Sequence, residues 1–403
     1  MRSATRGRAT FIAPSAASGD RRRRRRHRRR QIFAVSRQDA RETTVERSPF
    51  PLSAFESSSS SVPPAARFLW SSSGQPAPSH GLRALRFDRD WLEAASDKER
   101  FEKEMRVKRA LLAEDKGSGV VVWSDEASDA VEECLKMAVD WLCERYPKRY
   151  AVTEDGCVRV DEWTSARPVE DHRGRDALVL LGHLVQEDLC FMRPQELDDG
   201  STTYVFNAGA VCFSFDPQKR RDKALRALHA PVPDYESKMS RVVDKIFDSL
   251  QVNRPMWRAN WAVQNSDEII TTDAPWHPSN RAIGGVDRRA EVRSCFDDAK
   301  TFADEAHVGY MDPLSALPTQ PEDVPKSMFL RVEYETIVRL PRTGYILFTI
   351  HTYCDALGEF DEECSTALLR AMRESSAKEL DYKSLGHEPL RRVVEEYLTS
   401  VTT

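Results

Sequence analysis

The sequence contains no pair of cysteines in C-x-x-C spacing. Its eight cysteines are scattered along the chain, and most of them lie in apolar contexts. Closely spaced cysteines would be needed for a ferredoxin-type iron–sulfur cluster or a zinc site, and a regular set of them for a disulfide framework. The sequence therefore argues against all three kinds of site, and it predicts a reduced compartment.

Long apolar runs and a strong excess of one charge are lacking as well. No apolar run reaches the length needed to cross a bilayer, so no membrane partner is expected. The formal net charge of −4 is a mild acidity spread along the body of the chain, and it gives no nucleic-acid signature. The hydrophobic content of 40% is enough for one sizeable core.

Acidic residues are nearly absent from the start of the chain, where Asp20 is the only acid before Asp39. Arginine, serine and alanine abound instead, and residues 21–30 read RRRRRRHRRR. We expect residues 1–81 to form a disordered leader and residues 82–403 to form the folded domain. The leader composition is typical of a mitochondrial or plastid transit peptide. The alternatives are a nuclear-localisation or RNA-contacting tail, and an extension without an address on a cytoplasmic protein.

The strongest local pattern is a β-hairpin over residues 327–357. Its first strand alternates with the period of two that a strand requires. One side carries Leu330, Val332, Tyr334, Thr336, Val338 and Leu340, and the other carries Arg331, Glu333, Glu335, Ile337 and Arg339. The residues PRTG supply a turn, and an apolar return strand follows. Charges on a covered sheet face must be paired or must face a polar cavity.

The rest of the chain is predicted to complete an α+β domain. A capping box at residues 96–99 opens a helix that runs to about Glu114. We also expect helices at 125–146, 176–192, 361–374 and 387–399, a helix capped by Asp234, strands at 203–215 and 256–265, and a hairpin around Asp155-Gly156. Residues 272–326 lack periodicity and are interpreted as a surface insertion. This order predicts an antiparallel sheet with helices mostly on one face, and it is also the order of a PAS domain.

His229 lies in LHAPVPDY, the one stretch that is typical of a ligand site. Pro231 and Pro233 block a regular helix and fix the backbone after the histidine. A neutral imidazole on a rigid segment can bind a metal, but a histidine that only caps a turn would give the same pattern. His183, on an apolar helix, is the rival ligand, but its position favours a satisfied core or boundary histidine. His351 in the return strand is interpreted as a core or cavity-lining residue.

Six stretches carry a family resemblance: RFDRDWLEAASDKERFEKEMRVKRALLAE, LGHLVQEDLCFM, LHAPVPDY, RANWAVQN, LRVEYETIVRLPRTGYILFTIHTY and LDYKSL. In these stretches the chain resembles the haem-dependent oxidative N-demethylase family, in its catalytic alpha subunit. The likeness runs from about Leu82 to the C-terminus and excludes the leader. The hairpin departs from the family's usual wording at Tyr334, Glu335, Ile337 and Val338, and the insertion before it is another departure. Both concern the substrate more than the fold.

The resemblance implies a PAS-like fold that holds a b-type haem between a helix and the sheet, with His229 as the proximal ligand of the haem iron. It implies oxidation of a small methylated amine by O₂, with release of formaldehyde. It also implies a separate reductase that carries flavin and an iron–sulfur cluster, so neither group is expected in this chain.

Arg331 and Glu333 are the candidates for the polar pocket above the iron. A carboxylate there would hold a protonated amine, and a guanidinium would orient it or donate to bound oxygen. The alternatives are a buried structural ion pair and, for Arg331, a contact to a haem propionate. Arg258 and Asn260 are expected on one face of a neighbouring strand, with Trp261 opposite, where they would line the cavity or make a cross-strand contact.

Gln186, Glu187 and Asp188 are expected on or beside the polar face of the 176–192 helix. That face would dock the reductase or would simply be solvated. Three functions are compatible with these observations: a haem-dependent amine demethylase, a haem-binding PAS sensor or module without turnover, and a family member that binds no haem.

Overall fold

A computed structural model of the chain describes residues 64–65, 82–94, 97–114, 119–230, 232–272, 274–277, 310–312 and 315–402. All of them belong to one unit, Ser48–Thr403. The predicted leader apart from residues 64–65, the centre of the predicted insertion, and the residues Ser96 and Pro231 lie outside the described part. Ala65 is fully buried and donates its backbone N–H to a carboxylate oxygen of Asp355 (2.5 Å).

Within the described residues, the main sheet has seven antiparallel strands in the order β1-β8-β9-β10-β6-β7-β2. They are β1 (Arg83–Ala84), β2 (Val121–Val122), β6 (Asp188–Glu196), β7 (Thr202–Ala210), β8 (Met256–Gln264), β9 (Phe329–Arg339) and β10 (Ile346–Ala356). A small sheet contains β3 (Tyr150–Val152), β4 (Val158–Val160) and β5 (Trp163–Thr164). The predicted α+β class with an antiparallel sheet is confirmed, and the likeness to a PAS domain stays a prediction.

The α-helices of the described part surround this sheet. They are α2 (Phe87–Asp90), α3 (Lys98–Ala113), α5 (Ser128–Arg145), α6 (Gly174–Leu184), α7 (Leu225–Leu228), α8 (Ser240–Ser249), α10 (Val324–Ser327), α11 (Glu362–Glu374), α12 (Ala377–Tyr382) and α13 (Glu388–Val401). None of the described helices is both long and apolar enough to cross a membrane. The N-terminus of α3 is capped by Asp97, whose carboxylate accepts the N–H groups of Glu99 and Arg100.

The predicted hairpin is present as β9 and β10, the two longest strands. Each has eleven residues, and they pair in register from Ile346 opposite Arg339 to Ala356 opposite Phe329. Gly344 closes the turn at φ +73°, a conformation that L side chains rarely adopt. The hairpin is central, because β8 and β6 flank it on both sides.

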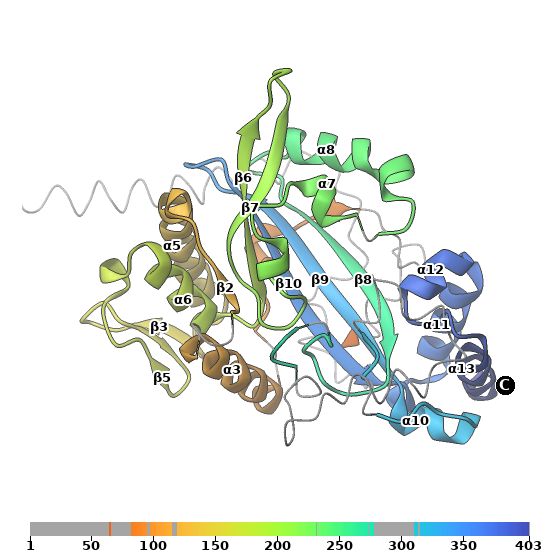
Figure 1. The fold of residues 1–403 in the computed structure, drawn as a ribbon. Coiled ribbons are helices and arrows are strands. Elements are labelled where there is room, and N and C mark those ends of the chain that lie inside the picture. Colours follow the sequence, from red (N-terminus) through yellow and green to blue (C-terminus); the bar gives the residue numbers. More distant parts are fainter. Residues whose placement is uncertain are drawn as a thin grey trace, which may run out of the picture. The chain divides into compact units, whose positions relative to one another are not determined.

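The two faces of β9 contact different helices. Val332, Tyr334 and Val338 belong to the main core, together with buried residues of α3, α5 and α6. On the other face, Ile337 belongs to a smaller core that includes Leu225 of α7 and other residues of α8 and β6. In Figure 1, α3, α5 and α6 are grouped on the left of the sheet, and α7 and α8 lie at its upper right.

The structure corrects the prediction at residues 176–192. Helix α6 ends at Leu184, Val185 is extended, and β6 begins at Asp188. The apolar run that follows suits a helix and a buried strand equally well, and pairing with β10 and β7 decides for the strand. Asp234 also differs from the prediction. It adopts a left-handed conformation (φ +56°) without a side-chain capping bond, before a π-helical turn at Tyr235–Met239.

Candidate functional site

Three charged residues of β9 project to one side of the sheet, because Arg331, Glu333 and Glu335 are two residues apart. Opposite Glu333 and Glu335 on β8 lie Asn260 and Arg258. The exposed fractions of the three β9 residues are only 1%, 7% and 4%. The three charged side chains of β9 are therefore buried. Arg258 and Asn260 lie on the same face of β8, as predicted, and that face is the one that carries these charges.

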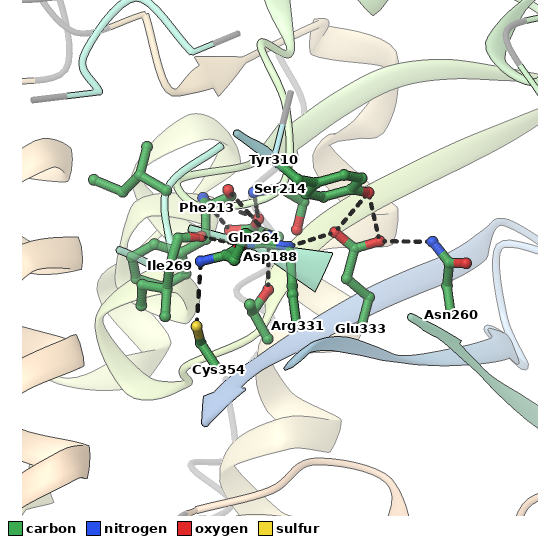
Figure 2. A network of polar contacts seen from close by, with 12 residues as sticks. Asp188, Phe213, Ser214, Asn260, Gln264, Ile269, Tyr310, Arg331, Glu333 and Cys354 are labelled. Atoms are coloured by element: carbon green, nitrogen blue, oxygen red, sulfur yellow. Dashed lines mark hydrogen bonds and ion pairs between the residues drawn. The ribbon is translucent and has the colours of Figure 1, made fainter. Parts of the chain in front are cut away.

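Arg331 connects β9 to two loops that cover this end of the sheet, as Figure 2 shows. Its Nε donates to Glu333 Oε1 (3.1 Å), and its Nη1 donates to the carbonyl oxygen of Ile269 (2.7 Å). Its Nη2 donates to the carbonyl oxygen of Phe213 (3.4 Å) and to Thr352 Oγ1 (3.3 Å). The guanidinium is thus used to hold Glu333 and the loops in place.

Glu333 accepts hydrogen bonds from three side chains (Figure 2). The shortest comes from Arg331. Asn260 Nδ2 donates to Oε2 at 3.3 Å, and the Tyr310 hydroxyl donates at 3.4 and 3.5 Å. The bonds from Asn260 and Tyr310 are near the limit for a hydrogen bond, so a ligand N–H could replace one of them at small cost.

Arg258 and Glu335 form a second ion pair next to the first. Arg258 donates through Nε in a short contact and through Nη2 to Oε1 at 3.1 Å, which is the forked geometry that carboxylates favour. Burial raises the pKa of Glu335, although the neighbouring Arg258 acts in the opposite direction. Both pairs have the geometry of the structural ion pair that was the alternative to a pocket.

Lys383 completes the polar cluster, which we define as Arg331, Glu333, Glu335, Arg258, Asn260 and Lys383. It follows α12 and is 2% exposed, and its Nζ donates to Asn260 Oδ1 at 2.6 Å. Burial, with a contribution from Arg258, lowers the pKa of Lys383 to about 7. The sequence pattern gave no sign of this residue beyond its place in LDYKSL, because a lysine at the end of a short helix usually faces solvent.

His229 follows α7 on the same side of the sheet as the smaller core. Its Nδ1 lies 2.8 Å from the carbonyl oxygen of Leu225, and its ring stacks on Tyr235 with 4.8 Å between centroids. Burial lowers the pKa of His229 to about 4, helped by Arg258 and Arg220 and opposed by the bond to Leu225. The imidazole is therefore neutral near pH 7, and the Leu225 carbonyl selects the tautomer whose Nε2 carries a free lone pair.

The rival histidines lie in other surroundings. His183 stacks on Trp163 of the small sheet with 5.5 Å between centroids, and burial lowers its pKa to about 4. His351 is on the opposite face of the main sheet, where Nδ1 lies 3.2 Å from Glu187 Oε1. The structure therefore does not bring them to the polar cluster.

The acidic stretch after α6 is not an exposed helix face. Gln186, Glu187 and Asp188 are 2%, 1% and 0% exposed. The first two precede β6, and Asp188 is its first residue. Asp188 accepts the backbone N–H groups of residues 212–214, and Glu187 binds His351. Both interpretations of this stretch, a docking face and a solvated face, are wrong, because the chain turns inward at Val185.

Among the described residues, no group of three or more His, Cys, Asp or Glu side chains is placed to hold a metal ion. A haem iron differs from such a site in needing only one axial side chain, and His229 stays the predicted ligand. A family model described as haem-dependent oxidative N-demethylase, alpha subunit-like, matches residues 81–391. The chain belongs to this family. The predicted resemblance is confirmed, and the match excludes the arginine-rich leader.

The name of the haem-dependent oxidative N-demethylase, alpha subunit-like family carries three properties: dependence on haem, oxidative removal of a methyl group from nitrogen, and a subunit of a larger system. The matched range contains His229 and the whole polar cluster. The family assignment thus covers both parts of the candidate site, while the roles of single residues remain predictions.

Proposed function

We propose that this chain is a haem-binding oxidoreductase that removes a methyl group from a small methylated amine with O₂. A separate reductase with flavin and an iron–sulfur cluster supplies the electrons. The observation that carries the proposal is the state of His229, which is neutral, held by Leu225 through Nδ1, and placed on the sheet side that carries Arg258.

The chemistry of the residues around His229 supports the proposal of a bound haem. Metal-binding histidines usually donate their second N–H to a carbonyl or carboxylate, as His229 does to Leu225. Half-buried or buried apolar residues lie on the same side: Leu225, Leu228, Val243, Met256 and Phe348. The sequence has no C-x-x-C-H attachment motif, so we propose a non-covalent haem b. When bound there, haem would supply O₂ activation and electron transfer.

In this proposal Glu333 binds the substrate nitrogen. A protonated amine donates to the carboxylate in place of the long bonds from Asn260 or Tyr310. Arg331 holds the carboxylate in its orientation through the bond from Nε to Oε1, so we assign it a positioning role instead of a contact with oxygen. The burial of the cluster excludes water from the amine, which strengthens the charge–charge contact.

One observation favours a second candidate, a haem-binding module without turnover. Arg331 and Glu333 are buried and already paired with each other, as in a structural ion pair. In such a module the chain would bind haem through His229 but would not release formaldehyde from methylated amines. A third candidate is a family member without haem, which would differ from both in having no Soret band.

The visible spectrum of the full-length chain, titrated with haemin, tests the proposal. We expect a Soret band in the wild type, its loss in His229→Ala, and its retention in the control His183→Ala. A His229→Ala variant with an unchanged spectrum would refute the ligand assignment. Formaldehyde release from dimethylamine with an artificial electron donor then separates the demethylase from the module.

A further inference from the structure

Lys383 is held at the open edge of β8 by its own backbone. Its carbonyl oxygen accepts the N–H of Val263 (3.1 Å), and its N–H donates to the carbonyl oxygen of Glu379 (2.9 Å). Ser384, directly after it, has φ +63°, which turns the chain sharply away. The position of the lysine is therefore fixed by three local features and does not depend on its side chain.

Within the described part of the chain, the ammonium group has one hydrogen bond, to Asn260, although it can donate three. The rings of Trp261 and Tyr382 lie 5.1 and 5.4 Å from Nζ and supply cation–π contacts. Among the residues that the structure describes, no carboxylate lies within ion-pair distance of Nζ. A lysine that is 2% exposed is rarely left without an anionic partner.

The charges of the polar cluster do not balance. Arg331 is paired with Glu333, and Arg258 is paired with Glu335. When it is protonated, Lys383 adds one positive charge to these two neutral pairs. An unpaired buried cation costs free energy that a protein recovers when an anion binds beside it.

The charges around Nζ favour the binding of an anion. Burial and Arg258 lower the pKa of Lys383, whereas Glu333, Glu335 and Glu379 raise it only in part. A carboxylate that arrives next to Nζ would return the lysine to its charged form and would use its two remaining N–H groups. Asn260 bridges Lys383 and Glu333, so an anion at the lysine would lie close to an amine at Glu333.

We propose that Lys383 binds a carboxylate group of the molecule that occupies the site. The inference rests on the proposed function, which offers two sources of this chemistry. One is a propionate of haem. The other is the substrate, which would then be an N-methylated amino acid with its nitrogen at Glu333 and its carboxylate at Lys383, instead of a simple alkylamine.

Two titrations of full-length Lys383→Met and wild type distinguish the sources. The first compares haemin with haemin dimethyl ester by absorbance. The second compares N,N-dimethylglycine with trimethylamine by calorimetry. Methionine fills a similar volume and removes a buried charge, so the variant should remain folded, which thermal melting checks. The control Lys378→Met removes an exposed lysine of α12, the helix that Lys383 follows; Lys378 pairs with Asp234 (2.9 Å).

In one of the titrations, wild type and Lys378→Met should bind the ligand with a free carboxylate (haemin or N,N-dimethylglycine) at least tenfold more tightly than its partner without one. Lys383→Met should bind the two ligands equally. A lost preference for haemin assigns Lys383 to a propionate, and a lost preference for dimethylglycine assigns it to the substrate. Equal preferences in all three proteins, in both titrations, would overturn the inference. If wild type fails to bind haemin, the proposed function fails, but dimethylglycine can still be titrated into the haem-free chain.

Discussion

Strand β9 presents an apolar face to α3, α5 and α6 and a charged face to α7, α8 and the loops around residues 213 and 269. On the first face Val332 and Val338 are buried among apolar neighbours. On the second, Arg331 and Glu335 are equally buried but are held by hydrogen bonds and ion pairs. A strand places neighbouring residues on opposite faces, so a single eleven-residue segment builds both the core and the site.

The two faces of β9 contribute differently to the stability of the fold. Apolar burial on the first face stabilises the fold in proportion to the area removed from water. Buried ion pairs on the second face add little net stability, because the loss of hydration offsets their attraction. The charges on the second face therefore account for little of the stability of the fold.

The largest expected effect comes from breaking one ion pair. Arg331→Met should destabilise the chain by about 3–5 kcal/mol, because it leaves the Glu333 carboxylate buried without a cation. Urea unfolding measures the change. Arg331→Met combined with Glu333→Leu should recover most of the loss. On the apolar face, Leu330→Ala should cost about 2–5 kcal/mol, with no such recovery from a second truncation at Val338. If the two losses of stability were additive on the charged face as well as on the apolar face, the proposed difference between the faces would be wrong.

Lys383→Met should have the next largest effect and the opposite sign. It should stabilise the chain by about 1–4 kcal/mol below pH 7, where the buried lysine is charged in both states. Because the pKa of Lys383 falls from 10.5 to about 7 on folding, the unfolded chain binds more protons between these values, and wild-type stability rises with pH there. Urea unfolding at pH 6.5 and pH 9.5 should show the advantage of the variant shrinking. A constant advantage would contradict this explanation.

Glu333→Gln tests binding on the charged face. The variant should retain haem, because His229 is unchanged, and should bind a methylated amine about tenfold more weakly, because a neutral amide attracts a cation less than a carboxylate does. Calorimetric titration measures the affinity. The matched control is Glu363→Gln, an exposed residue of α11. Equal affinities in the two variants would reject the role of Glu333.

The smallest effect is expected from His351 on the apolar face. Burial alone would lower the pKa of His351, but the hydrogen bond and charge of Glu187 outweigh it and raise the pKa above the ordinary 6.5. A raised pKa contributes stability that is present below pH 6.5 and is lost as the pH rises through the folded value. His351→Gln should remove this falling slope, as urea unfolding between pH 5.5 and 8 would show. An unchanged slope would mean that His351 does not titrate.

The hairpin could be predicted from the sequence because its information is local. Alternation at residues 330–339 and the PRTG turn determine which side chains share a face, and the structure confirms both. The stretch after Leu184 could not be predicted in this way. Its apolar residues fit either a helix or a strand, and its partners on β10 lie more than 150 residues away.

The candidate site could be predicted only in part, because some of its contacts join residues that lie far apart in the sequence. Glu333 and Arg331 were found from a charge pattern within one strand. Lys383 is 123 residues from Asn260, its hydrogen-bond partner, and only the folded chain shows that its ammonium is buried. The inward direction of Glu187 likewise depends on contacts with His351 and Glu93, which lie far from it in sequence.

The backbone bond between Lys383 and Val263 has a consequence for engineering. It satisfies an edge of β8 that β1 leaves open, and it does so whatever side chain residue 383 carries. The side chain at residue 383 can therefore change without loss of this backbone contact. If the carboxylate that Lys383 binds belongs to the substrate, a library varied at this one position should change the substrate at constant fold.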